Sequence, residues 1–347
     1  MRAAWTLGLA LALGCSAAPP AIRPAPRAVL EAHARQIHAV AFSPDGSLFA
    51  SAGGGAVNPA IDEITLWTTA TADRRLTFAN YKDVVSCLAF SPDAKTLAVG
   101  SSGGRLALLD IDSGTERSFF AGRAGQVSSL SFSFDGKVLV SVVHADEEKE
   151  LLEVCRWDVQ RGESRDTFTA DATAPVALSS EGGALAWSVR GQPPGIRVLD
   201  LETKTERTFP KIGVNRGDSM IFSPDGKWLA AVHYEDWSPI PNRCPYLYLI
   251  EAQTGRIRLR SPRPFDARRG LALSHDARLL ARGVDQGLQL WDLKTLEVVA
   301  TVIEAPSRSS GADMLVFSPD DRTLVSTNGT GLLFLWDVPR LLETRRD

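Results

Sequence analysis

A five-residue stretch that contains an acidic side chain recurs along the chain, and recurring carboxylates could serve as general acids and bases or as metal ligands. The copies are FSPDG at 42–46, FSPDA at 90–94, FSFDG at 132–136, FSPDG at 222–226 and FSPDD at 317–321. Two degenerate copies, LSSEG at 178–182 and LSHDA at 273–277, complete the series. Either chemistry requires carboxylates that converge on one substrate or ion, so their role depends on where the surrounding elements place them.

The copies recur at nearly even intervals, from 42 residues (Phe90 to Phe132) to 51 residues (Phe222 to Leu273). A period of this size indicates an array of equivalent structural units. Alternating apolar and polar residues flank each copy, which is typical of strands. Proline suits the second position of a type I turn, serine hydrogen-bonds within such turns, and glycine accepts the positive φ that closes a hairpin. We therefore expect a strand–turn–strand unit at each copy.

Each unit ends in a second hydrophobic run, which usually closes on an acidic residue. These runs are ITLWT (64–68), LALLD (106–110), VCRWD (154–158), IRVLD (196–200), LYLIE (247–251), LQLWD (288–292) and LFLWD (333–337). A fourth short strand generally follows, as in ERSFFA at 116–121. Every unit therefore predicts four short strands separated by turns.

A unit that runs from V-x-F-S-P-D-G to L-W-D resembles the WD40 repeat, and seven of them imply an all-β, seven-bladed β-propeller. The resemblance places the propeller at residues 28–340 and a C-terminal tail at 341–347. Residues 28–33 (AVLEAH) read like the last strand of a unit, and the seventh unit lacks that strand. We expect the N-terminal strand to pair in the last blade and close the ring, which removes an open sheet edge.

The propeller arrangement separates the turn carboxylates. They lie at equivalent corners of different blades, so we expect a structural role for Asp45, Asp93, Asp135, Asp225 and Asp320. The resemblance also implies a hydrogen-bonded tetrad of His, Ser, Asp and Trp, which only the first unit retains. Its members would be His33, Ser51, Asp62 and Trp67, and we expect packing to hold the other blades.

Several local signatures of catalysis are missing from the sequence, which contains no HExxH, Walker-type or EF-hand motif. The predicted inner strands are apolar. We therefore expect no catalytic residue, no cofactor and no metal. One alternative is a propeller enzyme, such as a periplasmic hydrolase or lactonase, with a metal at the channel mouth. Another is a TolB-like periplasmic propeller, although the LWD endings at 290–292 and 335–337 favour WD40.

The first residues have the composition of an export signal. Arg2 precedes an apolar run that is too short to span a bilayer, and small residues follow it. The sequence Ala-Leu-Gly-Cys at 12–15 resembles the lipobox of bacterial lipoproteins, although Ala12 stands where leucine is usual. The resemblance implies a signal peptide at 1–14 and lipidation at Cys15. Simple secretion with cleavage after Ala18 is the alternative.

Residues 15–27 are rich in alanine and proline and predict a semi-rigid tether. A lipid on Cys15 would anchor the protein in the bacterial cell envelope, facing the periplasm, and Ser16 favours the outer over the inner membrane by analogy with lipoprotein sorting. The net charge of −3 and the lack of a long basic run argue against nucleic acid as a partner. We expect a monomer that binds other proteins.

The predicted loops carry the candidate partner-binding residues. The loop over 233–246 mixes aromatic, apolar and basic side chains, a composition found at interface hot spots. Its candidates are Tyr234, Trp237, Ile240 and Arg243, although Trp237 would equally suit packing against its own blade. Loops nearer the channel contribute Arg123, Arg216, Arg268, Arg269 and Arg308, which would bind carboxylates or phosphates or pair with nearby acids such as Asp218 and Asp313.

Overall fold

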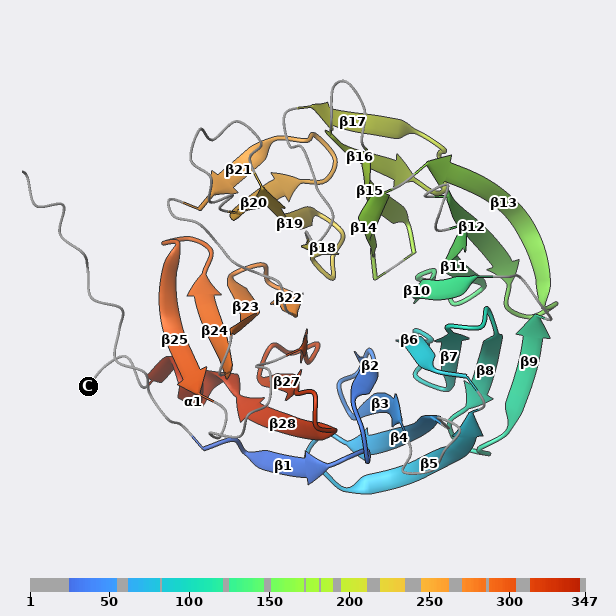
Figure 1. Cartoon of the computed structure of the whole chain (residues 1–347), viewed down its shortest axis with the longest axis horizontal. Coiled ribbons are helices and arrows are strands. Elements are labelled where there is room, and N and C mark those ends of the chain that lie inside the picture. The colour runs from blue at the N-terminus through green and yellow to red at the C-terminus, as the bar shows by residue number, and fades with distance from the viewer. Residues whose placement is uncertain are drawn as a thin grey trace, which may run out of the picture.

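The fold is a ring of seven four-stranded antiparallel sheets, the blades, arranged around a central axis (Figure 1). The computed structural model describes residues 25–54, 62–81, 83–120, 125–146, 151–171, 173–180, 182–189, 195–210, 219–234, 245–261, 270–284, 287–303 and 313–343. Within each blade the strands are called a to d from the axis outward. This architecture confirms the predicted all-β, seven-bladed propeller.

The strands follow the chain blade by blade. Blade 1 contains β2 (Ile37–Phe42), β3 (Leu48–Gly54), β4 (Asp62–Thr68) and β5 (Arg74–Tyr81). Blade 2 contains β6 (Val85–Phe90), β7 (Thr96–Ser101), β8 (Leu106–Asp110) and β9 (Glu116–Phe120). Blade 3 contains β10 (Gln126–Phe132), β11 (Val138–Asp146), β12 (Leu151–Asp158) and β13 (Glu163–Asp171). Blade 4 contains β14 (Thr173–Leu178), β15 (Ala184–Val189), β16 (Gly195–Asp200) and β17 (Glu206–Pro210).

The remaining blades repeat the pattern. Blade 5 contains β18 (Ser219–Phe222), β19 (Trp228–Tyr234), β20 (Pro245–Glu251) and β21 (Ile257–Arg260). Blade 6 contains β22 (Leu271–Leu273), β23 (Leu279–Val284), β24 (Gly287–Asp292) and β25 (Glu297–Ile303). Blade 7 contains β26 (Met314–Phe317), β27 (Thr323–Thr327), β28 (Leu332–Asp337) and, as its outer strand, β1 (Ala28–Glu31).

The N-terminal strand closes the ring as the sequence predicts. β1 lies antiparallel to β28, with Ala28 opposite Leu335 and Glu31 opposite Leu332 (Figure 1). The chain then crosses to blade 1, and the Gly331 carbonyl accepts hydrogen bonds from the amides of Ala32 and His33, each at 3.2 Å. The first and last repeats are therefore joined by backbone hydrogen bonds.

A short helix, α1 (Val338–Glu343), follows β28, so the expected start of a tail at residue 341 lies inside an ordered element. Leu341 is only 2% exposed and packs with residues of blades 6 and 7. Burial of this leucine holds the last turn of the chain against the ring. No helix among the described residues is long and apolar enough to cross a membrane.

The apolar core is divided among the interfaces between blades. Within the described residues it forms seven clusters, and each draws its members from two adjacent blades. The cluster between blades 7 and 1 contains Phe49, Trp67 and Leu335, with Leu30 of β1 packed against it. Antiparallel strands alternate in direction, so the a–b and c–d turns lie on one face of the ring and the b–c and d–a connections on the other.

Candidate functional site

The repeated serine and aspartate hold each a–b turn from within. In blade 1 the Ser43 hydroxyl donates to Asp45 Oδ1 at 2.6 Å and accepts from the Leu48 amide at 2.9 Å. Asp45 Oδ1 also accepts from the Ser47 amide at 3.0 Å. The same serine-to-aspartate hydrogen bond occurs in blades 2, 3, 5, 6 and 7.

These hydrogen bonds favour the ionised carboxylates. The Ser43 hydroxyl lowers the pKa of Asp45 below its ordinary value, and the Ser91 hydroxyl does the same for Asp93. Each carboxylate is engaged in its own turn, and the turns belong to different blades. The turn carboxylates therefore stabilise the hairpins and do not converge on one site.

Several a–b turns lie against the turn of the preceding blade. A Cβ added at Gly46 of blade 1 would lie 3.4 Å from Pro319 Cδ of blade 7, and one at Gly136 of blade 3 would lie 3.4 Å from Pro92 Cδ of blade 2. In both pairs the fourth residue of one turn lies against the second residue of the preceding blade's turn. The a–b turns of blades 7 and 1, and those of blades 2 and 3, therefore lie side by side.

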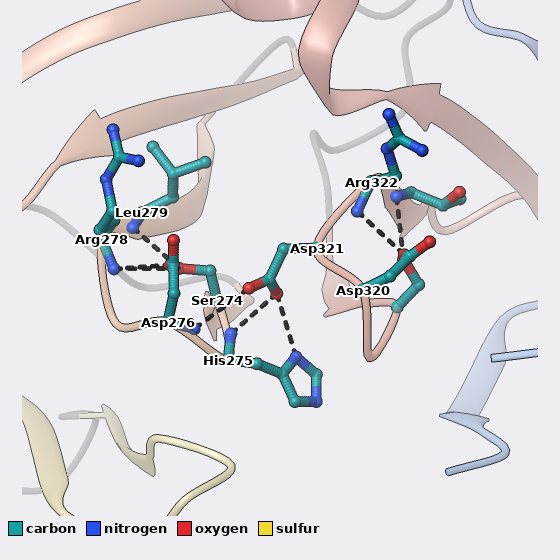
Figure 2. Close-up of polar contacts among 10 residues, drawn as sticks. Ser274, His275, Asp276, Arg278, Leu279, Asp320, Asp321 and Arg322 are labelled. Atoms are coloured by element: carbon teal, nitrogen blue, oxygen red, sulfur yellow. Dashed lines mark hydrogen bonds and ion pairs between the residues drawn. The ribbon is translucent and has the colours of Figure 1, made fainter. Parts of the chain in front are cut away.

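Blades 6 and 7 make this contact through polar groups (Figure 2). Asp321 occupies the fourth position of the blade 7 turn, and His275 occupies the second position of the blade 6 turn. Asp321 Oδ1 accepts from the His275 amide at 2.7 Å and lies 3.0 Å from His275 Nδ1. Asp321 Oδ2 accepts from the Asp276 amide at 3.1 Å. Three contacts therefore fix the carboxylate and orient the imidazole.

The ring of turns surrounds a central cavity of about 580 Å³. The a strands supply most of its wall, including Leu88, Leu130, Ile221 and Val316. The second residues of the seven turns also line it: Pro44, Pro92, Phe134, Ser180, Pro224, His275 and Pro319. The cavity therefore opens on the a–b turn face, opposite the connections in which the sequence analysis placed the candidate partner-binding residues.

The predicted tetrad is joined through three of its four members. Ser51 Oγ lies 2.8 Å from His33 Nε2 and accepts from Trp67 Nε1 at 2.9 Å. Asp62 Oδ2 accepts from the Val85 amide of blade 2 at 2.7 Å. His33 Nδ1 and Asp62 Oδ1 are buried without a hydrogen-bond partner among the described residues. Asp62 therefore links blades 1 and 2 through the Val85 amide.

The tryptophan–serine half of this arrangement also occurs outside blade 1, which the sequence analysis did not anticipate. Trp157 Nε1 donates to Ser141 Oγ at 2.8 Å in blade 3, and Trp336 Nε1 donates to Ser326 Oγ at 2.9 Å in blade 7. The signal was present in the sequence as a serine on strand b and a tryptophan on strand c.

The predicted lipidation site, Cys15, and most of the predicted partner-binding residues lie outside the described residues. These binding residues are Arg123, Arg216, Trp237, Ile240, Arg243, Arg268, Arg269 and Arg308. Tyr234 ends β19, where the b–c connection of blade 5 begins. Among the described residues, no group of three or more His, Cys, Asp and Glu side chains is arranged to hold a metal ion.

Comparison with known proteins finds a family model that matches part of the chain and several sequences that are similar to it. The family model "WD domain, G-beta repeat" matches residues 24–58 and 73–110. WD repeat-containing protein 90 of Xenopus tropicalis is 22% identical over 79% of this chain, which spans 15% of that protein. Autophagy-related protein 16 of Arabidopsis thaliana is 24% identical over 73% of this chain, which spans 47% of that protein. The chain spans less than half the length of both relatives.

One further sequence and one solved structure are also similar to the chain. Telomerase Cajal body protein 1 of Rattus norvegicus is 33% identical over 36% of this chain, which spans 22% of that protein. The structure of Kuenenia stuttgartiensis hydrazine synthase covers 90% of this chain with a TM-score of 0.67 and 18% identity, and the match covers 97% of that solved chain. At that identity the likeness concerns the fold alone. The seven-bladed ring defines the class: the chain is an all-β, seven-bladed propeller, and residues 24–58 and 73–110 match the WD40 repeat model.

Proposed function

We propose that the protein is a non-enzymatic platform for protein–protein interaction, which binds its partner on the face that carries the d–a and b–c connections. WD40 propellers typically act as interaction scaffolds, and this fold suits that role. The observation that carries the proposal is the closed ring, in which adjacent blades share each core cluster and β1 joins the last blade to the first. Such a frame holds its connections in fixed positions. Closure within one chain also supports a monomer.

The blade 5 connection is the proposed centre of that face. It starts at Tyr234 and carries Trp237, Ile240 and Arg243, and tryptophan and arginine dominate many interface hot spots. Arg123, Arg216, Arg268, Arg269 and Arg308 belong to other connections on the same face and would pair with acidic groups of the partner. The turn carboxylates are engaged in their own hairpins, which supports a binding role over catalysis.

Affinity capture with the full exported protein tests this proposal. The bait is incubated with envelope extract, and a retained partner is purified and titrated against variants of the bait. We expect Trp237→Ala and the double change Arg268→Glu/Arg269→Glu each to weaken binding by tenfold or more, because truncation of a hot spot costs about 2 kcal/mol. Phe134→Ser, on the opposite face, is the matched control. Equal losses for the control and the Trp237 variant would contradict the proposal.

The same protein is proposed to be exported and lipid-anchored through Cys15, with residues 15–27 as a tether to the propeller. The Ala-Leu-Gly-Cys sequence at 12–15 and the apolar run before it support this assignment. Cys15→Ala is expected to abolish incorporation of labelled palmitate and to move the protein from the membrane to the soluble fraction. A Cys87→Ala variant, which alters a cysteine inside the propeller, should keep the label. Membrane association without label in the wild type would contradict lipidation.

A further inference from the structure

We propose that the central cavity on the a–b turn face binds a small, uncharged, largely apolar molecule that carries one hydrogen-bond donor, with His275 Nε2 as the acceptor. The site is separate from the partner-binding face proposed above and does not depend on it. The assignment rests on the size of the cavity, on the residues that line it and on the orientation of the His275 imidazole.

The dimensions of the cavity suit a small organic molecule. Its volume of about 580 Å³ falls within the range of ligand pockets, roughly 300–1,000 Å³. Residues of all seven blades enclose it, so it is a central chamber and not a groove that would accept an extended peptide. Because the blades share their core clusters, the chamber is formed before any ligand binds.

The lining selects against charge. No Asp, Glu, Lys or Arg is among the described residues that line the cavity, and most are apolar. A charged ligand would lose its hydration there without a counter-ion, at a cost of several kcal/mol. Phe134 replaces the usual proline at the rim and is 80% exposed, which places a large apolar surface at the entrance. An apolar ring or chain could cover this phenylalanine as it enters.

His275 supplies a polar contact with a defined direction. The Asp321 carboxylate can only accept hydrogen bonds, so an imidazole with a single proton would carry it on Nδ1, 3.0 Å from Asp321 Oδ1. Nε2 is then an acceptor. Figure 2 shows the ring projecting away from Asp321, with Nδ1 toward the carboxylate and the other nitrogen on the far side. A ligand must therefore offer a donor such as a hydroxyl, and the negative charge of Asp321 disfavours a carboxylate at the same place.

Two other polar side chains of the wall are already engaged. Ser131 Oγ donates to the Ser180 carbonyl at 2.7 Å, which joins blades 3 and 4, and Ser133 Oγ donates to Asp135 at 2.7 Å. Both hydroxyls donate their proton within the protein, so neither can donate to a ligand. This favours a molecule that brings its own donor, and His275 Nε2 is the acceptor that we assign to it.

The test compares two matched probes, 1-naphthalenemethanol and 1-methylnaphthalene, which differ by one hydroxyl group. Binding to the full-length protein is followed by naphthalene fluorescence anisotropy. We expect saturable binding of one molecule per chain, with the alcohol about fivefold tighter, the effect of a hydrogen bond of about 1 kcal/mol. The anion 1-naphthoate should not displace the alcohol at equal concentration.

Variants locate the site. His275→Phe keeps a ring at the rim and should make the two affinities equal, whereas retention of the hydroxyl preference would overturn the role of His275. Ala41→Trp fills the cavity from β2 and should abolish binding of both probes, with thermal unfolding as the check on folding. Leu88→Trp fills the cavity from β6 and replaces Ala41→Trp in this test if that variant does not fold. Absence of saturable binding to the wild type, or binding unchanged in a folded cavity-filling variant, would overturn the proposal.

Discussion

At the scale of single residues, His33 shows how burial creates sensitivity to acid. Its ring is enclosed beside Ser51, and the side chain is among the buried polar groups of the described residues. Burial, together with the positive charges of Arg74 and His38, lowers the pKa of His33 to about 4. Burial also raises the pKa of the neighbouring Asp62. Protonation of Asp62 therefore favours the folded state at lower pH, which is opposite to the effect of His33. The neutral imidazole is therefore the form that the folded protein accommodates.

The lowered pKa predicts a loss of stability on acidification. The unfolded chain protonates His33 near its ordinary pKa of 6.5, whereas the folded protein does so only near 4. The folded state thus binds fewer protons between these values, and the free energy of unfolding should fall as pH drops from 6.5 toward 4, by up to about 3 kcal/mol. Urea unfolding at a series of pH values measures this slope. His33→Gln should flatten it, and an unchanged slope in that variant would exclude His33 as the source.

The fourth position of the a–b turn offers a second test at residue scale. Every turn has a positive φ there, from 53° at Ala277 to 70° at Gly46. Gly46→Ala places a methyl group at an ordinary contact distance from Pro319, so its expected cost of about 1 kcal/mol reflects the backbone conformation alone. Ala94→Gly, where φ is 57°, should stabilise by a fraction of that amount. Chemical denaturation measures the free energy of unfolding of both variants. Changes of the same sign would contradict the view that the positive φ determines the cost.

At the scale of elements, the sequence predicts the strands well and the C-terminal helix poorly. Strand β1 could be predicted because the seventh repeat lacks an outer strand and AVLEAH supplies one. Helix α1 could not, since VPRLLE is too short to show a helical period. Its position depends on Leu341 packing against blades 6 and 7, and that contact is visible only in the folded ring.

Burial of Leu341 predicts that the end of the propeller lies beyond residue 340. Leu341→Ala removes a side chain that is 2% exposed and should cost about 2–4 kcal/mol of stability. Arg340→Ala, at the adjacent exposed position, is the matched control and should change stability by less than about 0.5 kcal/mol. Thermal unfolding of both variants decides the point. A shift in the melting temperature of Leu341→Ala no larger than that of the control would instead support a tail that starts at residue 341.

At the scale of the whole molecule, the repeat period determines the architecture but not the sites on it. Even spacing, turn residues and L-W-D endings predict seven blades, because each is a local signal that recurs. The central cavity could not be predicted, since it depends on how far seven inner strands stand from the axis. Its two distinctive residues were nevertheless visible as departures from proline at the second turn position, Phe134 in FSFDG and His275 in LSHDA.

Removal of residues 28–33 should open the ring. The deletion takes away Leu30 and Ala32 from the cluster between blades 7 and 1 and leaves the edge of β28 without a partner strand. We expect loss of a single cooperative thermal transition and concentration-dependent association, measured by calorimetry and light scattering. Val29→Thr, at a side chain that is 50% exposed on β1, is the matched control and should behave as wild type. A deletion variant that stays monomeric and unfolds as the wild type does would contradict the closure argument.

The ring of turns also affects the orientation in which a ligand binds at the mouth of the cavity. If the seven turns were identical, a ligand at the mouth of the cavity could bind in seven equivalent orientations and would occupy each of them for a fraction of the time. Phe134 in blade 3 and His275 in blade 6 lie on different sides of the mouth, one apolar and one polar, and Pro44, Pro92, Pro224 and Pro319 fill four of the other five positions. Because Phe134, Ser180 and His275 interrupt the series of prolines, the seven positions around the mouth are not equivalent, and a bound ligand would adopt one preferred orientation.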